Sequence, residues 1–542
     1  MKYTSNKVII TLLAVVFALS ASAQDASLAG GMKMYYYKKY QSARKILEPL
    51  AATDPKANYF LGLTVLESGN IKEANSIFSK FPEDPANISG VARVAFANKN
   101  VSNGMQIAKD LASKSRKKEW QQEKFAADAI AYTDGGDYQQ AVTWYKDVLT
   151  KTDDADVHIG MGDVYRKIPG GAGDAMTNYE HVTDKDAKNS LAFSRIGDTW
   201  YEARNYPSAL DNYAKAKDAD PSNPLPYKSL ADAYYRSGNY PKALENMKKY
   251  MELSDNTLAD QKLYVELMYN AKSYCDAADL AKKLLPLQTD PAAKTELYGI
   301  LGFSQAECGD SMQALNNLHT YFKMQAPSKI TPGAYIQFGK LFLKMGQLDS
   351  AGYYYTKGIS GDTAKNKTDI YREVAEAFKT KKNYCKSAEW YDNLIKANPE
   401  TQQLDYFWRG CMFYYCKDYP SALKAFDDYK TKYPDANPAY YWRGRAAAAI
   451  DSEGKEGTAV ADFTTWLNKV GPNYDKKNDM KIALEYLLIY YYNKKDNDNL
   501  KATEEKVRAM DPNNSLLKQI EDAEKSGTSP AHKSGGAGKS KK

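Results

Sequence analysis

The sequence repeats one pattern of small and aromatic residues at an interval of about 34 residues. The clearest copy contains Tyr227, Leu230, Ala231, Tyr234, Gly238, Tyr240, Ala243, Met247 and Tyr250. Copies in the same register contain Phe193, Ile196, Gly197, Trp200, Tyr206, Ala209 and Tyr213; Tyr335, Phe338, Gly339, Phe342, Ala351 and Tyr355; and Tyr406, Gly410, Phe413, Tyr419, Ala422 and Phe426. Such a period predicts successive similar units that share one elongated core, in place of the three or four separate domains that 542 residues otherwise suggest.

Each copy is predicted to form two helices joined by a tight turn. Small residues let the two helices of a copy approach closely, and large side chains fill the remaining space; they are Gly197, Ala231, Gly339 and Gly410 in the first helices and Ala209, Ala243, Ala351 and Ala422 in the second. The turns place a capping residue before a proline, as in Asn205-Tyr206-Pro207, Asn239-Tyr240-Pro241 and Asp418-Tyr419-Pro420. No run of strands interrupts this pattern, so we expect an all-α protein.

The pattern resembles the tetratricopeptide repeat (TPR) family along nearly the whole chain. Sliding it along the sequence places about fourteen repeats, which start near residues 24, 55, 85, 122, 155, 190, 224, 258, 295, 332, 368, 403, 437 and 481. The resemblance implies an all-α, right-handed superhelical solenoid of helix-turn-helix repeats over residues 24–524.

The N-terminus has the features of a secretory signal peptide. Lys2 and Lys7 precede an apolar run over 8–19 and the small residues Ala21-Ser22-Ala23, which predicts a signal peptide of residues 1–23 with cleavage before Gln24. The alternative, a membrane anchor, is weaker because the run has about twelve residues where about 20 are needed to span a bilayer. We therefore expect a periplasmic protein that does not span the membrane.

The positive charge lies at the two ends of the chain. The formal net charge of +7 equals the number of lysines in residues 1–23 and 525–542, which contain no acidic residue, so residues 24–524 are neutral. A neutral body lacks the large basic surface that drives nucleic-acid binding, and we expect no nucleic-acid partner. Residues 525–542 are predicted to form a disordered basic tail, which offers peripheral association with an anionic envelope polymer or simply aids solubility.

The cysteines occupy corresponding places in two pairs of repeats. Cys275 and Cys385 fall at the start of a second helix, and Cys308 and Cys416 fall at the end of the first helix of the next repeat. These helix ends are neighbours in a stack of antiparallel helices, which predicts the disulfides Cys275–Cys308 and Cys385–Cys416 and leaves Cys411 over. A Cys411–Cys416 pair is disfavoured because the two residues point to different sides of one helix; a fully reduced set is the other alternative.

Residue patterns that carry catalysis or bind a metal or cofactor are missing from the sequence. The histidines are His158, His181, His319 and His532, none in a metal-binding spacing, and no nucleophile with a base partner is recognisable. We therefore expect no enzyme activity, no cofactor and no metal. Two irregular segments, 168–173 and 451–457, are candidate functional loops, although tolerated surface insertions are the more common explanation.

The resemblance to the TPR family implies that partner proteins bind in the concave groove lined by the first helices. The groove positions that carry aromatic residues or arginine are Tyr201, Tyr235, Phe407, Tyr414, Tyr441, Arg445 and Tyr492. We expect an interaction scaffold or assembly factor for envelope proteins, in outer-membrane biogenesis or secretion. The alternative is a carbohydrate-binding or glycan-processing envelope protein, which requires exposed Trp and Tyr faces beside carboxylates.

Overall fold

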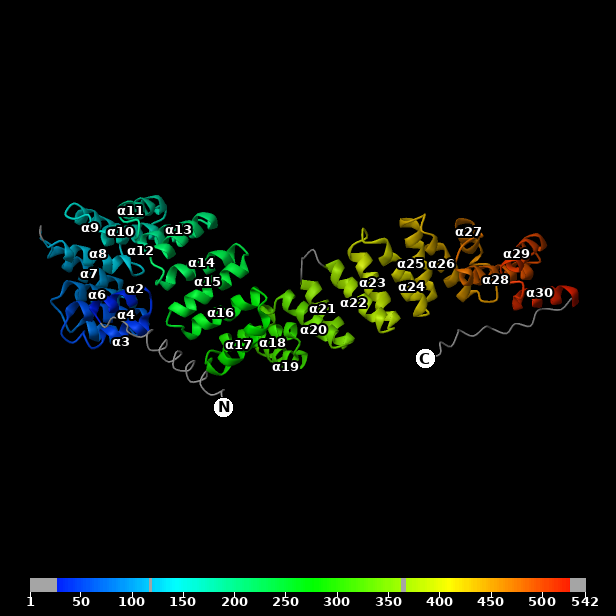
Figure 1. The fold of residues 1–542 in the computed structure, drawn as a ribbon, viewed down its shortest axis with the longest axis horizontal. Coiled ribbons are helices and arrows are strands. Elements are labelled where there is room, and N and C mark those ends of the chain that lie inside the picture. Colours follow the sequence, from blue (N-terminus) through cyan, green and yellow to red (C-terminus); the bar gives the residue numbers. More distant parts are fainter. Residues whose placement is uncertain (1–26, 117–118, 362–366, 527–542) are drawn as a thin grey trace, which may run out of the picture. The chain divides into compact units, whose positions relative to one another are not determined.

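The computed structural model describes residues 27–116, 119–361 and 367–526 (Figure 1). These residues are helical, and within them the only β-type pairing is an isolated bridge between Arg116 and Glu119. The expected signal peptide at 1–23 and residues 527–542 of the expected tail lie outside the described part, whereas Lys525 and Ser526 end the last helix. The prediction of an all-α protein is confirmed.

The chain divides into an N-terminal unit up to Tyr321 and a C-terminal unit from Phe322. The N-terminal unit contains α2 (Leu28–Tyr36), α3 (Tyr40–Leu47), α4 (Pro55–Glu67), α5 (Ile71–Phe78), α6 (Pro85–Ala97), α7 (Val101–Ser113), α8 (Gln121–Ala131), α9 (Tyr138–Leu149), α10 (Ala155–Lys167), α11 (Ala172–Lys185), α12 (Ser190–Glu202), α13 (Tyr206–Ala219), α14 (Pro224–Arg236), α15 (Tyr240–Leu253), α16 (Leu258–Asn270), α17 (Tyr274–Leu284) and α18 (Pro291–Cys308).

The boundary between the units lies in α19 (Ser311–Met324). The C-terminal unit continues with α20 (Pro332–Lys344), α21 (Leu348–Gly361), α22 (Lys367–Thr380), α23 (Tyr384–Ala397), α24 (Gln403–Tyr415), α25 (Tyr419–Lys432), α26 (Asn437–Ile450), α27 (Val460–Val470), α28 (Lys477–Lys494), α29 (Asn497–Met510) and α30 (Ser515–Ser526).

In the described residues these helices form fourteen consecutive antiparallel pairs, followed by the single helix α30. Every first helix begins within four residues of the start predicted from the sequence period; α4, α6, α10, α12, α14, α16, α20, α24 and α26 begin at the predicted residue. The prediction of about fourteen helix-turn-helix repeats is confirmed.

The turn inside a repeat has the same structure in most copies. The side chain of Asn205 accepts a hydrogen bond from the Ser208 amide, and Asn239 and Asp418 make the corresponding bond to Lys242 and Ser421. The residue just before each cap has a positive φ, 58° at Arg204 and 78° at Gly238, which lets the helix end abruptly and the next one begin after three residues. The predicted caps therefore set the angle at which the two helices meet.

Small residues allow the two helices of a pair to pack closely. A Cβ atom added to Gly197 would lie 2.6 Å from the Tyr213 ring, and one added to Gly339 would lie 3.0 Å from the Tyr355 ring. Gly410 faces Phe426 in the same way. The first helix thus leaves out a side chain where the second helix inserts an aromatic ring, as the repeat pattern predicts.

The N-terminal unit coils back on itself. The hydroxyl of Tyr37 in the first pair donates to Asp220 and lies 3.0 Å from the Ser222 hydroxyl, just after the sixth pair. The Ser42 hydroxyl donates to Asp255, after the seventh pair, at 2.6 Å. These contacts join repeats that are far apart in the sequence, so the unit completes about one superhelical turn.

The two irregular segments differ from the expected loops. Only residues 168–171 separate α10 from α11, because Ala172 and Gly173 already belong to the helix. The second segment is organised by the buried Asp451, whose carboxylate accepts hydrogen bonds from the amides of Lys455, Glu456 and Gly457 at 2.8–3.1 Å. Both segments are ordered connections between paired helices.

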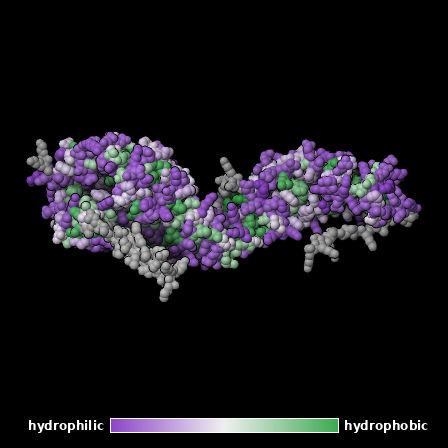
Figure 2. Space-filling view, in the orientation of Figure 1, coloured by the Kyte–Doolittle hydropathy of each residue, from purple (hydrophilic) through white to green (hydrophobic). Residues whose placement is uncertain are grey.

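Hydrophilic residues cover most of the face seen in Figure 2, and hydrophobic residues gather there only in small groups. Within the described ranges, no helix combines the length and the apolar composition needed to cross a bilayer.

Candidate partner-binding surface

Three of the predicted groove residues, Phe407, Tyr414 and Arg445, meet on two first helices of the C-terminal unit, together with Trp442, which the groove positions did not include. Arg445 on α26 places its guanidinium carbon 4.5 Å from the centre of the Trp442 ring and 4.9 Å from that of Tyr414 on α24. The Trp442 ring also packs edge-on against Tyr414 at 5.4 Å and Phe407 at 6.3 Å. We call Phe407, Tyr414, Trp442 and Arg445 the Arg445 cluster.

Arg445 differs from its neighbour Arg443 in its partners. Arg443 forms ion pairs with Asp427, at 2.6 Å, and with Asp462. Arg445 donates to the Tyr414 hydroxyl at 3.1 Å, and no carboxylate in the described part of the chain lies within ion-pair distance of it. The aromatic rings hold the guanidinium in place and leave several of its donors without an acidic partner.

Tyr441 packs against the buried side of this cluster. Its side chain is only 4% exposed, and its hydroxyl donates to Asp479 on α28 at 2.8 Å. Burial and the bond to Asp479 raise the pKa of Tyr441 above its ordinary value. Tyr441 therefore belongs to the core beneath Arg445, and its ring lies 5.7 Å from the guanidinium.

The remaining predicted groove residues lie elsewhere. Tyr201 packs edge-on against Tyr206 at 5.6 Å, and Tyr235 packs against Tyr240 at 5.5 Å, in each case across the turn of one repeat. Tyr269–Tyr274 and Tyr414–Tyr419 repeat this arrangement. Each of these tyrosines thus packs one side of its ring against the tyrosine that begins the second helix, and this contact stabilises the turn. Tyr492, on α28, packs against the core between α28 and α30.

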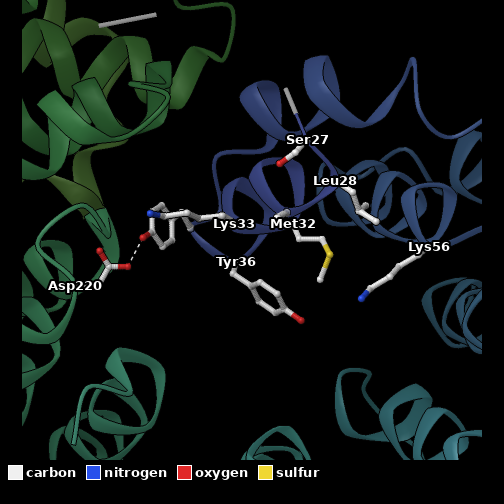
Figure 3. Close-up of a pocket in the computed structure, with 9 residues that line it drawn as sticks. Ser27, Leu28, Met32, Lys33, Tyr36, Lys56 and Asp220 are labelled. Carbon is white, nitrogen blue, oxygen red and sulfur yellow. Dashed lines mark hydrogen bonds between the residues drawn. The ribbon is translucent and has the colours of Figure 1, made fainter. Parts of the chain in front are cut away.

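The N-terminal unit has a pocket of about 700 Å³ that the sequence pattern did not indicate (Figure 3). Met32, Lys33 and Tyr36 on α2 line it together with Lys56 on α4, and Figure 3 shows Asp220 on the opposite side from Lys56. Tyr36 is 48% exposed, and partial desolvation, with a smaller contribution from Asp156, raises its pKa above the ordinary value. Tyr36 lies one residue beyond the repeat position that Tyr201, Tyr235 and Tyr414 occupy, so the groove pattern does not include it.

The cysteines pair between neighbouring repeats. Cys275 bonds Cys308 with their Cα atoms 5.5 Å apart, and Cys385 bonds Cys416 with their Cα atoms 4.9 Å apart. Cys411 is left unpaired and is 1% exposed. Burial raises the pKa of its thiol, which keeps it protonated and unreactive.

Two of the histidines meet in the fifth repeat. The rings of His158 on α10 and His181 on α11 lie 4.1 Å apart, and the Nε2 atom of each is 2.9 Å from Oδ1 of Asp153. Burial lowers the pKa of His158, against a hydrogen bond to Asn178 that raises it. No short metal-binding motif contains these residues, because they come from two helices and the turn before them.

Comparisons with known proteins find similar proteins among the solved structures. No protein-family model matches the chain, and no curated protein matches it. The chain is similar to the C-terminal part of a TPR repeat-containing protein from Cytophaga hutchinsonii, with 24% identity over 48% of this chain and 98% of that one and a TM-score of 0.31. It is similar to PilF of Pseudomonas aeruginosa, with 17% identity over 41% and 96% of the two chains and a TM-score of 0.30.

A likeness that spans most of the sequence is to Cut9–Hcn1 of the APC/C, with 14% identity over 93% of this chain and 97% of that one and a TM-score of 0.28. The assignment of the fold rests on the fourteen described helix pairs, in which a glycine on the first helix repeatedly faces a large side chain on the second. The chain has a tetratricopeptide-repeat fold.

Proposed function

We propose that the protein is a non-catalytic scaffold that binds a segment of a partner protein on the first-helix face of its repeats. The main contact is the Arg445 cluster, and the observation that carries the proposal is the guanidinium held by rings without a carboxylate partner. Arginine and aromatic residues in such a setting are the residue types that dominate binding hot spots.

The chemistry of the cluster indicates what the partner segment offers. The free donors of Arg445 are suited to a carboxylate, since a guanidinium forms two parallel hydrogen bonds with one. Phe407 and Trp442 are half-buried beside it and offer apolar contact. We infer a segment with an acidic residue next to an apolar or aromatic one. Tyr201, Tyr235 and Tyr492 are proposed as further contacts along the first helices, and Tyr441 as a support for Arg445.

We further propose that the protein is exported to the periplasm and serves envelope proteins, in outer-membrane biogenesis or secretion. The signal-like residues 1–23 and the two cysteine pairs support this proposal, because disulfides persist in oxidising compartments. Cell fractionation together with N-terminal sequencing of the mature chain tests it, and a mature protein that begins at Gln24 in the periplasmic fraction is the expected result.

The glycan-binding alternative finds less support in the tryptophans. Trp144, Trp390 and Trp466 are buried. The faces of Trp408 and Trp442 are covered by cations, Lys379 at 3.8 Å and Arg445 at 4.5 Å. A sugar platform requires open ring faces beside carboxylates, so the observed arrangement favours a protein partner.

Site-specific photocrosslinking tests the scaffold function. A photoreactive residue replaces Tyr415, which is 43% exposed and packs 5.7 Å from Trp442, or Lys424, an exposed residue on α25 that serves as the control. We expect adducts to a protein at position 415 and none at 424, with Arg445→Gln reducing the yield about tenfold.

Two results contradict the proposal. Equal adducts at positions 415 and 424 show that the Arg445 cluster is not a preferred contact. Retention of envelope glycan without any protein adduct supports the carbohydrate-binding alternative instead.

A further inference from the structure

We propose that Asp153, His158 and His181 form a binding site for a divalent transition-metal ion of the Zn²⁺ class. This site is separate from the Arg445 cluster and does not depend on the proposed scaffold function. One oxygen and two nitrogens, contributed by three segments of the fifth repeat, converge within 4.8 Å of one another.

The three residues come from positions that the repeat holds rigidly. Asp153 lies in the turn before α10, directly before Asp154, whose side chain caps that helix. His158 is the fourth residue of α10. His181 lies in the C-terminal half of α11, which packs antiparallel to α10. The geometry is therefore set by the helix pair and not by a long mobile loop.

Hydrogen bonding determines which nitrogen of His158 faces the site. The Asn178 side-chain nitrogen donates to the Asp174 carbonyl at 2.8 Å, so its oxygen, 3.1 Å from His158 Nδ1, is an acceptor. His158 must then donate from Nδ1, and in the neutral ring Nε2 carries the lone pair. Asn178 is 8% exposed and acts as the second-layer residue that orients a metal-binding histidine.

With a neutral His158 ring, the contact between His158 and Asp153 is unfavourable. The lone pair of His158 Nε2 points at an anionic oxygen only 2.9 Å away. The same oxygen lies 2.9 Å from His181 Nε2. A proton on His158 alone satisfies its two contacts, whereas protons on both rings place two like charges in rings that lie 4.1 Å apart. A metal ion shared by the oxygen and both nitrogens satisfies the contacts with both rings neutral, and the titration below separates it from the proton.

The distances agree with the size of a zinc site. Zinc bonds of about 2.05 Å place neighbouring ligand atoms about 2.9 Å apart at a right angle and about 3.4 Å apart at the tetrahedral angle. Both oxygen-to-nitrogen distances are 2.9 Å, the right-angle value, so a tetrahedral ion requires them to widen by about 0.5 Å. Two imidazoles and one carboxylate leave a fourth position for water, and imidazole-rich sets select Zn²⁺ and neighbouring metals over Ca²⁺ or Mg²⁺.

Lys185 is a charged neighbour of the site. Its ammonium group pairs with Oδ2 of Asp153, whereas the histidines contact Oδ1. The ion pair fixes the carboxylate while Oδ1 stays directed at both rings. Lys185 therefore orients the carboxylate and does not occupy the metal position.

Calorimetric titration of the full chain with Zn²⁺ alone tests the site. We expect one bound equivalent near neutral pH, lost in His158→Gln, His181→Gln and Asp153→Asn. Asn178→Ala is expected to weaken binding about 10–100-fold, as removal of a second-layer partner does. His319→Gln, on α19, is the matched control and keeps wild-type binding.

A second set of measurements separates loss of the metal ligands from misfolding of the variants. Asp153→Asn changes an exposed turn residue and leaves both helices intact, as circular dichroism will verify. Co²⁺ substituted for Zn²⁺ reports nitrogen and oxygen ligation through its visible absorption. The proposal is overturned if the wild-type chain binds no Zn²⁺ at micromolar concentrations, or if folded Asp153→Asn and His181→Gln bind it as tightly as the wild type. The first result would show that hydrogen bonds from the histidine N–H groups to Asp153, without a metal ion, hold the three side chains together.

Discussion

The hydroxyl of Tyr179 donates a 2.8 Å hydrogen bond to the carboxylate of Asp163, and both side chains are buried between α10 and α11. Asp163 also forms an ion pair with Arg195 of the next repeat at 2.8 Å. Tyr213 makes the same bond to Asp198 at 2.9 Å, one repeat later. A single carboxylate thus links the two helices of one pair and joins that pair to the next.

Tyr179→Phe is expected to lower the free energy of unfolding by about 2 kcal/mol, because it removes a buried hydrogen bond to a charged acceptor. Urea denaturation followed by circular dichroism measures the change. Tyr240→Phe, at an exposed tyrosine, is the control and should change stability by less than about 0.5 kcal/mol. Equal effects of the two substitutions would contradict the importance of the Tyr179 bond.

Gly197→Ala is expected to destabilise the N-terminal unit by about 1–3 kcal/mol, since the added methyl group meets the Tyr213 ring at 2.6 Å. Gly173, also in a helix, has no neighbouring atom within 4 Å of an added Cβ. Gly173→Ala should therefore leave stability unchanged or raise it by up to about 1 kcal/mol. Thermal melts of the two variants measure the change in stability. A loss for Gly197→Ala alone shows that the cost comes from the contact with Tyr213 and not from replacing a helical glycine as such.

Removal of the Cys385–Cys416 disulfide by substituting both residues with serine is expected to lower stability by about 2–4 kcal/mol. The bond closes a loop between residues 31 apart in sequence and so restricts the unfolded chain. Denaturation with and without reductant measures the effect. A variant without both disulfides is the control, and a reductant effect that persists in it would exclude the disulfides as the cause.

Thiol counting tests the same pairing independently. The native oxidised protein should show no reactive thiol, and the denatured protein should show one, because Cys411 is buried and its pKa is raised. Intact mass after alkylation reports the number. More than one alkylated cysteine in the denatured, non-reduced chain would mean that at least one of the two pairs is open.

Asp451→Asn is expected to destabilise the chain at neutral pH and to have a smaller effect in acid. Burial raises the pKa of Asp451, but hydrogen bonds from Tyr486 and three backbone amides outweigh it and hold the pKa below its ordinary value. The charged carboxylate therefore contributes its full stability above about pH 4, and this contribution is lost as the pH falls through the lowered pKa.

Urea denaturation of the wild type and of Asp451→Asn between pH 7 and pH 3 measures this dependence. Asp435→Asn, at an exposed position before α26, is the control and should show no such convergence. A stability difference between wild type and Asp451→Asn that stays constant with pH would show that the amide reproduces the carboxylate's hydrogen bonds.

Most of the fold follows from the sequence because each repeat is a local structure. Asn205 caps the second helix from three residues before Ser208, and Gly197 and Tyr213 lie within one copy of the pattern. The cysteine pairing also follows, since neighbouring repeats place Cys275 beside Cys308 whenever the repeat register is known. Contacts between consensus positions of one repeat, or of neighbouring repeats, follow from the period itself.

The candidate sites were only partly predictable. The groove positions identify Phe407, Tyr414 and Arg445, but Tyr441 at a similar position is buried, because it packs against Trp466 in the core. Tyr36 lies outside the groove positions, so the pattern does not identify it. The repeat position of a residue predicts which face of its helix the side chain lies on. The exposure of that side chain depends on the side chains of neighbouring helices that pack against it.

The helix pairs, their starts to within four residues, their capped turns and the pairing of the cysteines follow from the amino-acid sequence, since all of these depend on residues at a fixed interval. The three-dimensional arrangement was needed to show that the side chains of Asp153, His158 and His181 meet within the fifth repeat, and that the first repeat contacts Asp220 and Asp255. The first result depends on which side chains the two helices of one pair turn toward each other. The second depends on the rotation between successive helix pairs and its accumulation over several repeats. A side chain's type and spacing do not specify that rotation, because it results from the packing of every helix pair in between.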